Sequence, residues 1–135
     1  MPKFSKTSEA NLKSCHSDLQ VIFNEVIKHF DHSILCGHRG ENEQNEAFRS
    51  GNSKLTYPNS RHNKIPSLVI DAVPFPVDWN DIDRMILFAG YVQGVAMMLH
   101  AKGLISHELR WGGDWNRNHK TSDERFKDYP HFELI

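Results

Sequence analysis

The residues best suited to chemistry stand in two separate segments of the chain. Ser60-Arg61-His62 lies a few residues before Asp71, and the last eight residues contain Asp128 and His131. Two imidazoles and one carboxylate can serve as the three protein ligands of a catalytic zinc ion, whose fourth position stays open for water. A second carboxylate beside that water can accept its proton. These residue types therefore indicate a zinc-dependent hydrolytic site.

Their spacing alone leaves other interpretations open. Asp71 lies in an apolar segment, where a carboxylate needs a compensating cation or donor, and a nearby arginine or a turn would meet that need as well as a metal. His131 is equally compatible with a hydrogen-bonded core histidine, and Asp128 with an ordinary loop aspartate. A histidine, eight intervening residues and an aspartate do not by themselves specify a metal site.

Hydrophobic periodicity predicts the elements that must hold these residues in place. After a Ser17 cap, Leu19, Ile22 and Val26 recur at helical spacing. The segment from Ser67 to Val73 is apolar and β-branched, which favours a buried strand. By the same criteria, helices are expected over about 8–14, 17–30, 41–49 and 80–102, and strands over 33–36, 67–73, 108–111 and 131–135.

Helices come first in this order, and strands mixed with one long helix follow. The order predicts an α+β domain with a small, mostly antiparallel sheet flanked by helices. Asn80 is expected to cap the long helix and Gly103 to end it. The face of this helix toward the core is expected to contain Ile82, Met85, Phe88 or Ala89, Val92, Val95 and Leu99.

Length and composition narrow the class of protein. The 135 residues are expected to form one domain, 1–135, and the net charge of −1 gives no reason to expect a nucleic-acid partner. The sequence contains no run of about 18 apolar residues, so no membrane span is expected. The first residues lack the apolar stretch of a secretory signal. The chain is therefore expected to be a monomer made in a cytosol, with Cys15 and Cys36 as free thiols.

Four motifs together carry a resemblance to a known family. They are Gly37–Gln44, Ser60–His62 with Asp71, Arg110–Trp115 and Pro130–Leu134, in this order and at suitable distances. With them the chain resembles the VanY-like zinc peptidases of the D-alanyl-D-alanine carboxypeptidase family, from about Leu19 to the C-terminus. It is most similar to the short phage endolysins that cut peptidoglycan between L-alanine and D-glutamate. The resemblance implies the D-Ala-D-Ala peptidase/hedgehog-like fold.

The resemblance also implies roles for individual residues. Asp128 matches the catalytic acid–base residue, and Arg39 matches the arginine that steadies the carbonyl oxygen as it gains negative charge. Ser60 matches a small residue that is thought to contact substrate. Three residues match the zinc ligands: His62, Asp71 and His131.

Two features qualify what the resemblance implies. Many relatives place six residues between the first histidine and the aspartate, whereas eight stand between His62 and Asp71, and this insertion is expected to affect specificity more than metal binding. Asp114, Asn116 and Asn118 alternate as at the start of a calcium loop, but position twelve is Arg125, so this is no EF-hand. Ca²⁺ therefore stands as a second candidate ion, with Asx turns as the alternative.

The expected substrate is a peptidoglycan peptide, reached after release of the protein from a host cytoplasm. Two rival functions stay open at this point. One is a D-Ala-D-Ala carboxypeptidase or dipeptidase. The other is a non-catalytic phage protein that binds cell wall, although such a scaffold has no need of a base such as Asp128.

Overall fold

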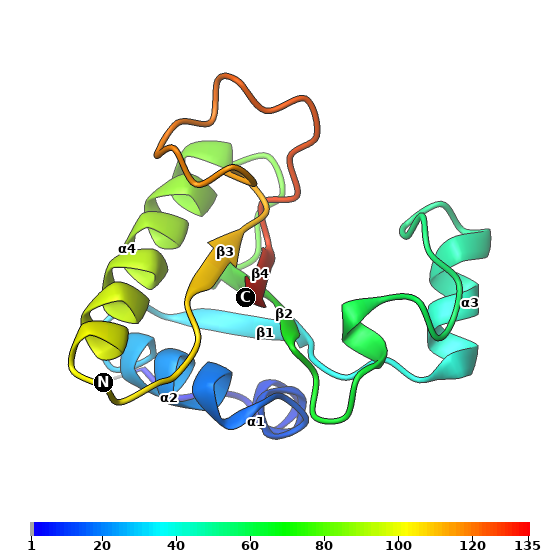
Figure 1. Ribbon diagram of the computed structural model, residues 1–135, viewed down its shortest axis with the longest axis horizontal. Helices are drawn as coiled ribbons and strands as arrows, with labels where there is room; N and C mark the ends of the chain where they lie inside the picture. Colours follow the sequence, from blue (N-terminus) through cyan, green and yellow to red (C-terminus); the bar gives the residue numbers. More distant parts are fainter. Residues whose placement is uncertain (1) are drawn as a thin grey trace.

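The computed structural model describes residues 2–135 and contains four α-helices, one short 3-10 helix and four strands (Figure 1). The helices are α1 (Lys6–Lys13), α2 (Ser17–Val26), α3 (Glu41–Arg49), η1 (Arg61–Asn63) and α4 (Ile82–Ala101). The strands are β1 (His32–Cys36), β2 (Val69–Pro74), β3 (Leu109–Trp111) and β4 (His131–Leu134). The structure confirms the α+β class expected from the sequence.

The four strands form one sheet in the order β1-β2-β4-β3, and every neighbouring pair is antiparallel. The last strand therefore lies inside the sheet, between β2 and β3. In the register of the sheet, Asp71 faces His131 across β2 and β4, and Arg110 faces Glu133 across β3 and β4. The two segments singled out in the sequence are thus cross-strand neighbours.

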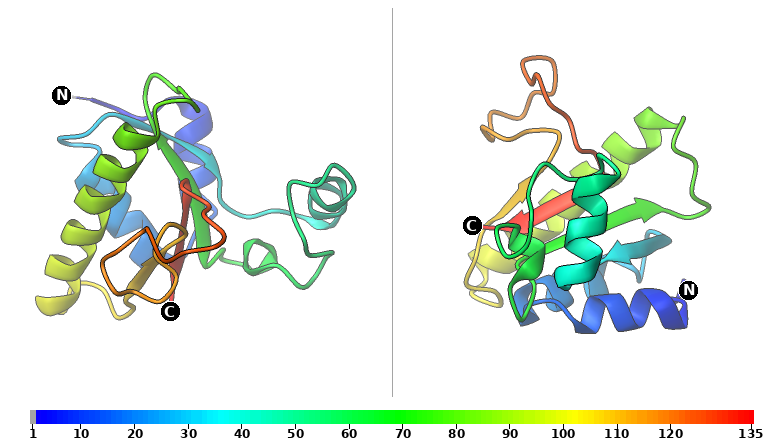
Figure 2. Two further views of the ribbon diagram at one scale, coloured as in Figure 1. Left: turned by 90° about the horizontal axis from the view of Figure 1, so that it is seen from above. Right: turned by 90° about the vertical axis from the view of Figure 1, so that its right-hand side faces the viewer.

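Helices α2 and α4 pack against one another and cover one face of the sheet, while α3 lies to the side, away from them (Figures 1 and 2). Side chains alternate between the two faces of a strand, so every second residue points into the core. The sheet contributes these residues to the core: Ile34, Ile70, Ala72, Trp111, Phe132 and Leu134. The opposite face carries Asp71, His131 and Glu133, together with the buried Val69 and Val73 of β2.

The helix starts differ from the prediction in their caps. Helix α2 is capped by His16 rather than Ser17, because the Nδ1 atom of His16 accepts the backbone N–H of Asp18 at 3.0 Å. Helix α4 is capped by Asp81 rather than Asn80, because Oδ1 of Asp81 accepts the N–H of Arg84 at 3.1 Å. Helix α2 also ends at Val26, four residues before the predicted end at Phe30.

Helix α4 buries a slightly different face from the predicted one. Ala96 and Ala89 are buried, whereas Val95 and Ile82 are only half-buried. Between residues 2 and 135, α4 is also the one helix that is long and apolar enough to cross a membrane by length and composition. A search for 18 consecutive apolar residues does not find α4, because Gly and Gln residues interrupt its apolar sequence. A core helix has the same composition, and α4 packs on α2 and the sheet.

His32 supplies a testable consequence of core packing. Its ring lies in β1 among Phe4, Phe23 and Phe88, with Nδ1 2.8 Å from the carbonyl oxygen of Phe30 and Nε2 buried without a partner among the described residues. Burial lowers the pKa of His32 to about 4, although the Phe30 carbonyl opposes this. An unfolded histidine titrates near pH 6.5.

Because the unfolded chain binds this proton more readily, the free energy of unfolding should decrease as the pH falls from about 6.5 to 4. The lowered pKa of His32 accounts for a decrease of about 3 kcal/mol in the free energy of unfolding over that window. A His32→Phe variant lacks this titration, so its free energy of unfolding should decrease by about 3 kcal/mol less than that of the native protein between pH 7 and pH 4. Urea unfolding followed by circular dichroism measures both. His29→Gln, at an exposed position, is the control. Parallel curves for native protein and His32→Phe would contradict the assignment.

Candidate active site

The candidate site lies on the sheet face opposite the core. Cys36 on β1 pairs with Asp71 on β2, and Asp71 pairs with His131 on β4, so the three residues form one row across the sheet. Their neighbours along the strands, Ile70 and Phe132, point into the core instead. The alternation of each strand thus brings a carboxylate and an imidazole together from positions 60 residues apart.

His62 reaches this row from η1. The 3-10 turn is capped by Ser60, whose Oγ accepts the N–H of His62 at 3.2 Å, while Oδ1 of Asn63 accepts the N–H of Ser60 at 3.0 Å. The Nδ1 atom of His62 lies 2.8 Å from the carbonyl oxygen of Gly37 and donates its hydrogen there. Burial lowers the pKa of His62 to about 4, so its ring is neutral at pH 7 with Nε2 as the free lone pair.

The two histidines meet different oxygens of Asp71. The Nε2 atom of His62 lies 3.6 Å from Oδ2 of Asp71, and Nδ1 of His131 lies 3.9 Å from Oδ1. An Nη2 atom of Arg39 lies 3.9 Å from Oδ2. Burial raises the pKa of Asp71, and the nearby His131 and Arg39 act in the opposite direction. These contacts are longer than hydrogen bonds, which leaves the carboxylate with room for a cation.

The donor set fits a zinc ion. Tetrahedral bonds of about 2.0–2.1 Å place two ligand atoms about 3.3 Å apart, somewhat less than the 3.6 and 3.9 Å between the two imidazole nitrogens and Asp71, so a bound ion would draw these groups together. Ligand histidines usually give their second ring hydrogen to a carbonyl or carboxylate, which fixes the tautomer. His62 does so to Gly37, and His131 does so to Glu133, with Nε2 2.7 Å from Oε1. His62, Asp71 and His131 could therefore hold zinc through Nε2, the carboxylate and Nδ1.

Cys36 is a fourth group near these atoms, and its Sγ could join His62 and Asp71 around an ion. The Sγ atom lies 3.8 Å from Nδ1 of His62, which is the nitrogen already committed to Gly37. Burial also raises the pKa of the Cys36 thiol, which disfavours the thiolate that zinc prefers. These two features favour His131 over Cys36 as the third ligand. Cys36 is half-buried and Cys15 buried, and both are free thiols.

Asp128 lies at the edge of the row, with Oδ2 3.7 Å from Nδ1 of His131. The carbonyl of Gly112 accepts the N–H of Asp128 at 2.8 Å, which ties the 112–128 loop closed before β4 begins. A Cβ at Gly112 would collide with the carbonyl of Asp128, so this glycine of the Trp111-Gly112-Gly113 motif is required by the close approach. Burial, reinforced by the charge of Asp71, raises the pKa of Asp128 and makes it a better base.

Arg39 is held from the side by α3. Its Nη1 donates to Oε1 of Gln44 at 3.0 Å, and its backbone N–H donates to the carbonyl of His62 at 2.8 Å. Gln44 is completely buried and also donates to the hydroxyl of Ser53 and the carbonyl of Leu55. A single glutamine on α3 therefore orients the arginine and anchors the loop that follows the helix.

A cavity of about 760 Å³ opens over these residues, between the 112–128 loop and the segment after α3. It contains all six residues named from the sequence: Arg39, Ser60, His62, Asp71, Asp128 and His131. Its remaining charged lining residues are Lys54 and Lys127, and its aromatic ones include Trp79, Trp115 and Phe126. The Nζ of Lys54 lies 5.2 Å from the centre of the Phe126 ring, so the two walls touch across the opening.

The insertion between His62 and Asp71 lies away from this cavity. Ile65 is 85% exposed, and Ser67 hydrogen-bonds through its backbone to Ser14 and His16, in the connection between α1 and α2. Among the described residues, none from 63 to 68 lines the cavity. The extra residues therefore give no structural reason for an altered groove.

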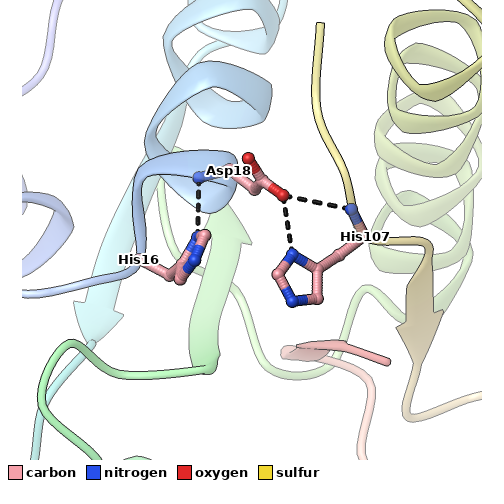
Figure 3. Close-up of side chains that lie close together, drawn as sticks. All are labelled: His16, Asp18 and His107. Atoms are coloured by element: carbon pink, nitrogen blue, oxygen red, sulfur yellow. Dashed lines mark hydrogen bonds and ion pairs between the residues drawn. The ribbon is translucent and has the colours of Figure 1, made fainter. Parts of the chain in front are cut away.

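A second group of metal-compatible side chains, His16, Asp18 and His107, is explained by its hydrogen bonds (Figure 3). The Oδ2 atom of Asp18 accepts the N–H groups of Ser106 and His107, the Ser106 hydroxyl and, at 2.7 Å, Nδ1 of His107. Partial burial raises the pKa of Asp18, but these bonds outweigh it and lower the pKa to about 2. The group fastens the start of α2 to the 105–108 segment.

The suggested calcium loop is also internally bonded. The two carboxylate oxygens of Asp114 accept the N–H groups of Asn118 and His119, at 3.1 and 2.8 Å. The Nδ2 atoms of Asn116 and Asn118 both donate to Asp123. In addition, Oδ1 of Asn116 accepts the N–H of Asn118 at 3.2 Å, and Oδ1 of Asn118 accepts the N–H of Lys120 at 2.9 Å. These two bonds are Asx turns, which the sequence offered as the alternative to Ca²⁺.

The sequence interpretation missed two residues of this site, Gln44 and Glu133, although both stood inside the motifs. Glu133 follows His131 by two residues on a strand, so the same side of the sheet was predictable for both. Burial raises the pKa of Glu133, but hydrogen bonds from His131 and Arg110 lower it to about 2. Gln44 was identified only as part of the Gly37–Gln44 motif and of the helix expected over 41–49, and neither indicated its contact with Arg39.

Comparison with known proteins supports the family resemblance. The crystal structure of the L-Ala D-Glu endopeptidase ChiX from Serratia marcescens superposes with a TM-score of 0.72 at 27% sequence identity, over 98% of this chain and 90% of that one. A search of curated proteins gave no match. The family model for the phage L-alanyl-D-glutamate peptidase matches residues 1–135 and confirms the resemblance seen in the motifs. The chain belongs to the phage L-alanyl-D-glutamate peptidase family.

Proposed function

We propose that this member of the family is a zinc-dependent endopeptidase in which His62, Asp71 and His131 hold the metal. The observation that carries the proposal is the convergence of two ring nitrogens, Nε2 of His62 and Nδ1 of His131, on the two oxygens of one half-buried carboxylate, Asp71. A bound zinc ion supplies a Lewis acid, which polarises a carbonyl and makes water acidic near neutral pH.

Asp128 is the base in this proposal. Its carboxylate takes the proton of the attacking water and returns it to the amine that leaves when the peptide bond breaks. Its position beside the His131 ring suits both halves of that transfer, and its raised pKa favours the first half. A carboxylate with an ordinary pKa would accept the proton from water less readily, although its acid form would give the proton to the amine more readily.

Arg39 and Ser60 bind the substrate in this proposal. Gln44 holds one side of the Arg39 guanidinium, which leaves Nη2 on the side of the cavity and Asp71. From there Nη2 can donate a hydrogen bond to the carbonyl oxygen of the scissile peptide bond as negative charge develops on that oxygen. An interaction of this kind is worth about 3 kcal/mol for a well-placed donor. The Ser60 hydroxyl accepts the His62 N–H and keeps its own hydrogen for a substrate oxygen.

Digestion of a defined muropeptide, with and without chelator, tests the proposal. An endopeptidase leaves a stem fragment that begins with D-glutamate, whereas a carboxypeptidase releases free D-alanine, and mass spectrometry separates the two. We expect the D-glutamate product, its loss in chelator and its return with added zinc. Cleavage that continues unchanged in chelator would contradict the metal, and D-alanine release would favour the carboxypeptidase alternative. Binding to isolated cell walls in a pull-down, without any cleavage product, would favour the alternative of a non-catalytic protein that binds cell wall.

The charge of the cavity favours an acidic peptide. A glutamate that gives its amine to the scissile bond has two carboxyl groups, and only one of them continues the stem. The other is free on the leaving side of the bond. Lys54 and Lys127 supply positive charge on the two opposing walls, outside the ligand and base cluster.

A Lys54→Gln/Lys127→Gln double variant should therefore raise KM for this peptide about tenfold with little change in kcat. Two exposed ion pairs of up to about 1 kcal/mol each set that scale. Lys13→Gln, an exposed position on α1, is the matched control. The effect should shrink in 0.5 M salt and with a substrate whose free carboxyl is amidated. An unchanged KM in the double variant would rule out these lysines as carboxylate partners.

Proteins of this family act on the cell wall. We infer that the chain works as a single, monomeric catalytic domain that is made in the host cytoplasm and reaches the wall after release by another factor. Neither nucleic acid nor a membrane is needed as a partner for this activity.

A further inference from the structure

Glu133 is a buried carboxylate that the catalytic scheme above does not use. It lies on β4, two residues after His131 and on the same face of the sheet, and is only 4% exposed. Burying a charge in this way is costly unless the charge is paired. Its partners therefore indicate why a glutamate stands there.

The two oxygens of Glu133 have separate partners. Oε1 lies 2.7 Å from Nε2 of His131, and Oε2 accepts a hydrogen bond from Nη2 of Arg110 at 2.7 Å. Arg110 is the cross-strand neighbour of Glu133 on β3, so the sheet register itself fixes this ion pair. The carboxylate thereby stays ionised and oriented, with one oxygen reserved for the histidine.

This contact determines which nitrogen of His131 faces the cavity. A carboxylate accepts but does not donate, so the Nε2 of a neutral His131 ring must carry the hydrogen. The lone pair is then on Nδ1, the atom that lies 3.9 Å from Asp71 and 3.7 Å from Asp128. The opposite tautomer would present an N–H to the metal position.

Glu133 also reaches the segment of the other histidine. Arg61, the residue before His62, has Nε 3.9 Å from Oε2 of Glu133 and hydrogen-bonds through Nη2 to the carbonyl of Leu134. One carboxylate is thus connected to β3 through Arg110, to β4 through His131 and to η1 through Arg61.

We propose that Glu133 is a positioning residue that holds His131 as the Nε2–H tautomer, so that this histidine binds the metal through Nδ1. The proposal rests on the proposed zinc site but has a readout that needs no metal. A carboxylate–histidine–metal arrangement of this kind is typically worth 10- to 100-fold in metal affinity.

Long-range ¹H–¹⁵N correlation spectra of the metal-free native protein at pH 8.5 test the tautomer directly. We expect the His131 ring to carry its hydrogen on Nε2. In Glu133→Ala the ring should show both tautomers, and in Glu133→Gln it should keep Nε2–H, because the amide oxygen can still accept. An Nδ1–H ring in the native protein would overturn the proposal without any variant.

Competition with a chromogenic chelator measures the second consequence. Zinc affinity should fall about 100-fold in Glu133→Ala and about tenfold in Glu133→Gln. It should be unchanged in Glu108→Gln, which removes an exposed carboxylate paired with Arg117. If both Glu133 variants keep native zinc affinity, the positioning role is wrong. If the native protein itself does not bind zinc while its tautomer is as expected, the proposed metal fails and the His131 contact stands.

Discussion

Replacing Asp128 by asparagine is expected to lower kcat/KM for cell-wall peptide about 1,000-fold while leaving bound zinc at the native level. The amide has nearly the shape of the carboxylate but cannot take a proton from water or return one to the leaving amine. Asp128 lies 3.7 Å from His131 at the rim of the cluster rather than between the histidines, so the ligand set survives the change. The measurements are the rate of release of the D-glutamate fragment and the zinc content by atomic absorption.

Asp83→Asn is the matched control for this change, since it alters an exposed aspartate at the start of α4 that does not line the cavity. It should retain native turnover. An Asp128→Asn protein with close to native activity would remove Asp128 from the mechanism. A variant that loses zinc as well as activity would instead place Asp128 among the metal ligands.

The second large effect concerns His131. A His131→Ala variant should lose both metal and activity, with zinc affinity down by more than about 100-fold and turnover at the level of chelated native protein. The change removes one of the two lone pairs that face Asp71 and also leaves Glu133 without its histidine partner. Equilibrium dialysis with zinc, followed by muropeptide digestion, measures both losses.

His100→Ala serves as the control, because it removes an exposed imidazole at the end of α4. It should bind zinc as tightly as the native protein. The pair Asp128→Asn and His131→Ala then separates two functions: the first should abolish turnover with metal present, and the second should abolish both. Native zinc affinity in His131→Ala would show that Cys36 or another group completes the site.

Much of the fold could be predicted because local sequence carries it. The apolar, β-branched run of β2 and the periodic apolar residues of α4 led to the correct elements within one or two residues at most ends. The caps were wrong by one residue, His16 for Ser17 and Asp81 for Asn80. Several polar residues adjoin each helix start, and the backbone path decides which side chain reaches the free N–H groups.

The site was predicted as a set of residues but not as an arrangement. The side-chain types of His62, Asp71, Asp128 and His131 indicated a hydrolytic zinc site, and the family resemblance added Arg39 and Ser60. All six line one cavity. The motifs did not reveal that Gln44 orients Arg39 or that Glu133 is shared by His131, Arg110 and Arg61. Those contacts join segments up to 72 residues apart and depend on strand register.

The sequence by itself determined which chemistry is available: imidazoles and carboxylates that can hold a metal, one further carboxylate that can take a proton, and an arginine that can face a developing charge. Only the tertiary structure decided which nitrogen of each histidine points inward and how strongly each carboxylate is buried. The reason is physical. Residue type sets what a group can donate or accept, whereas tautomer and pKa depend on neighbours that the chain supplies only after it has folded.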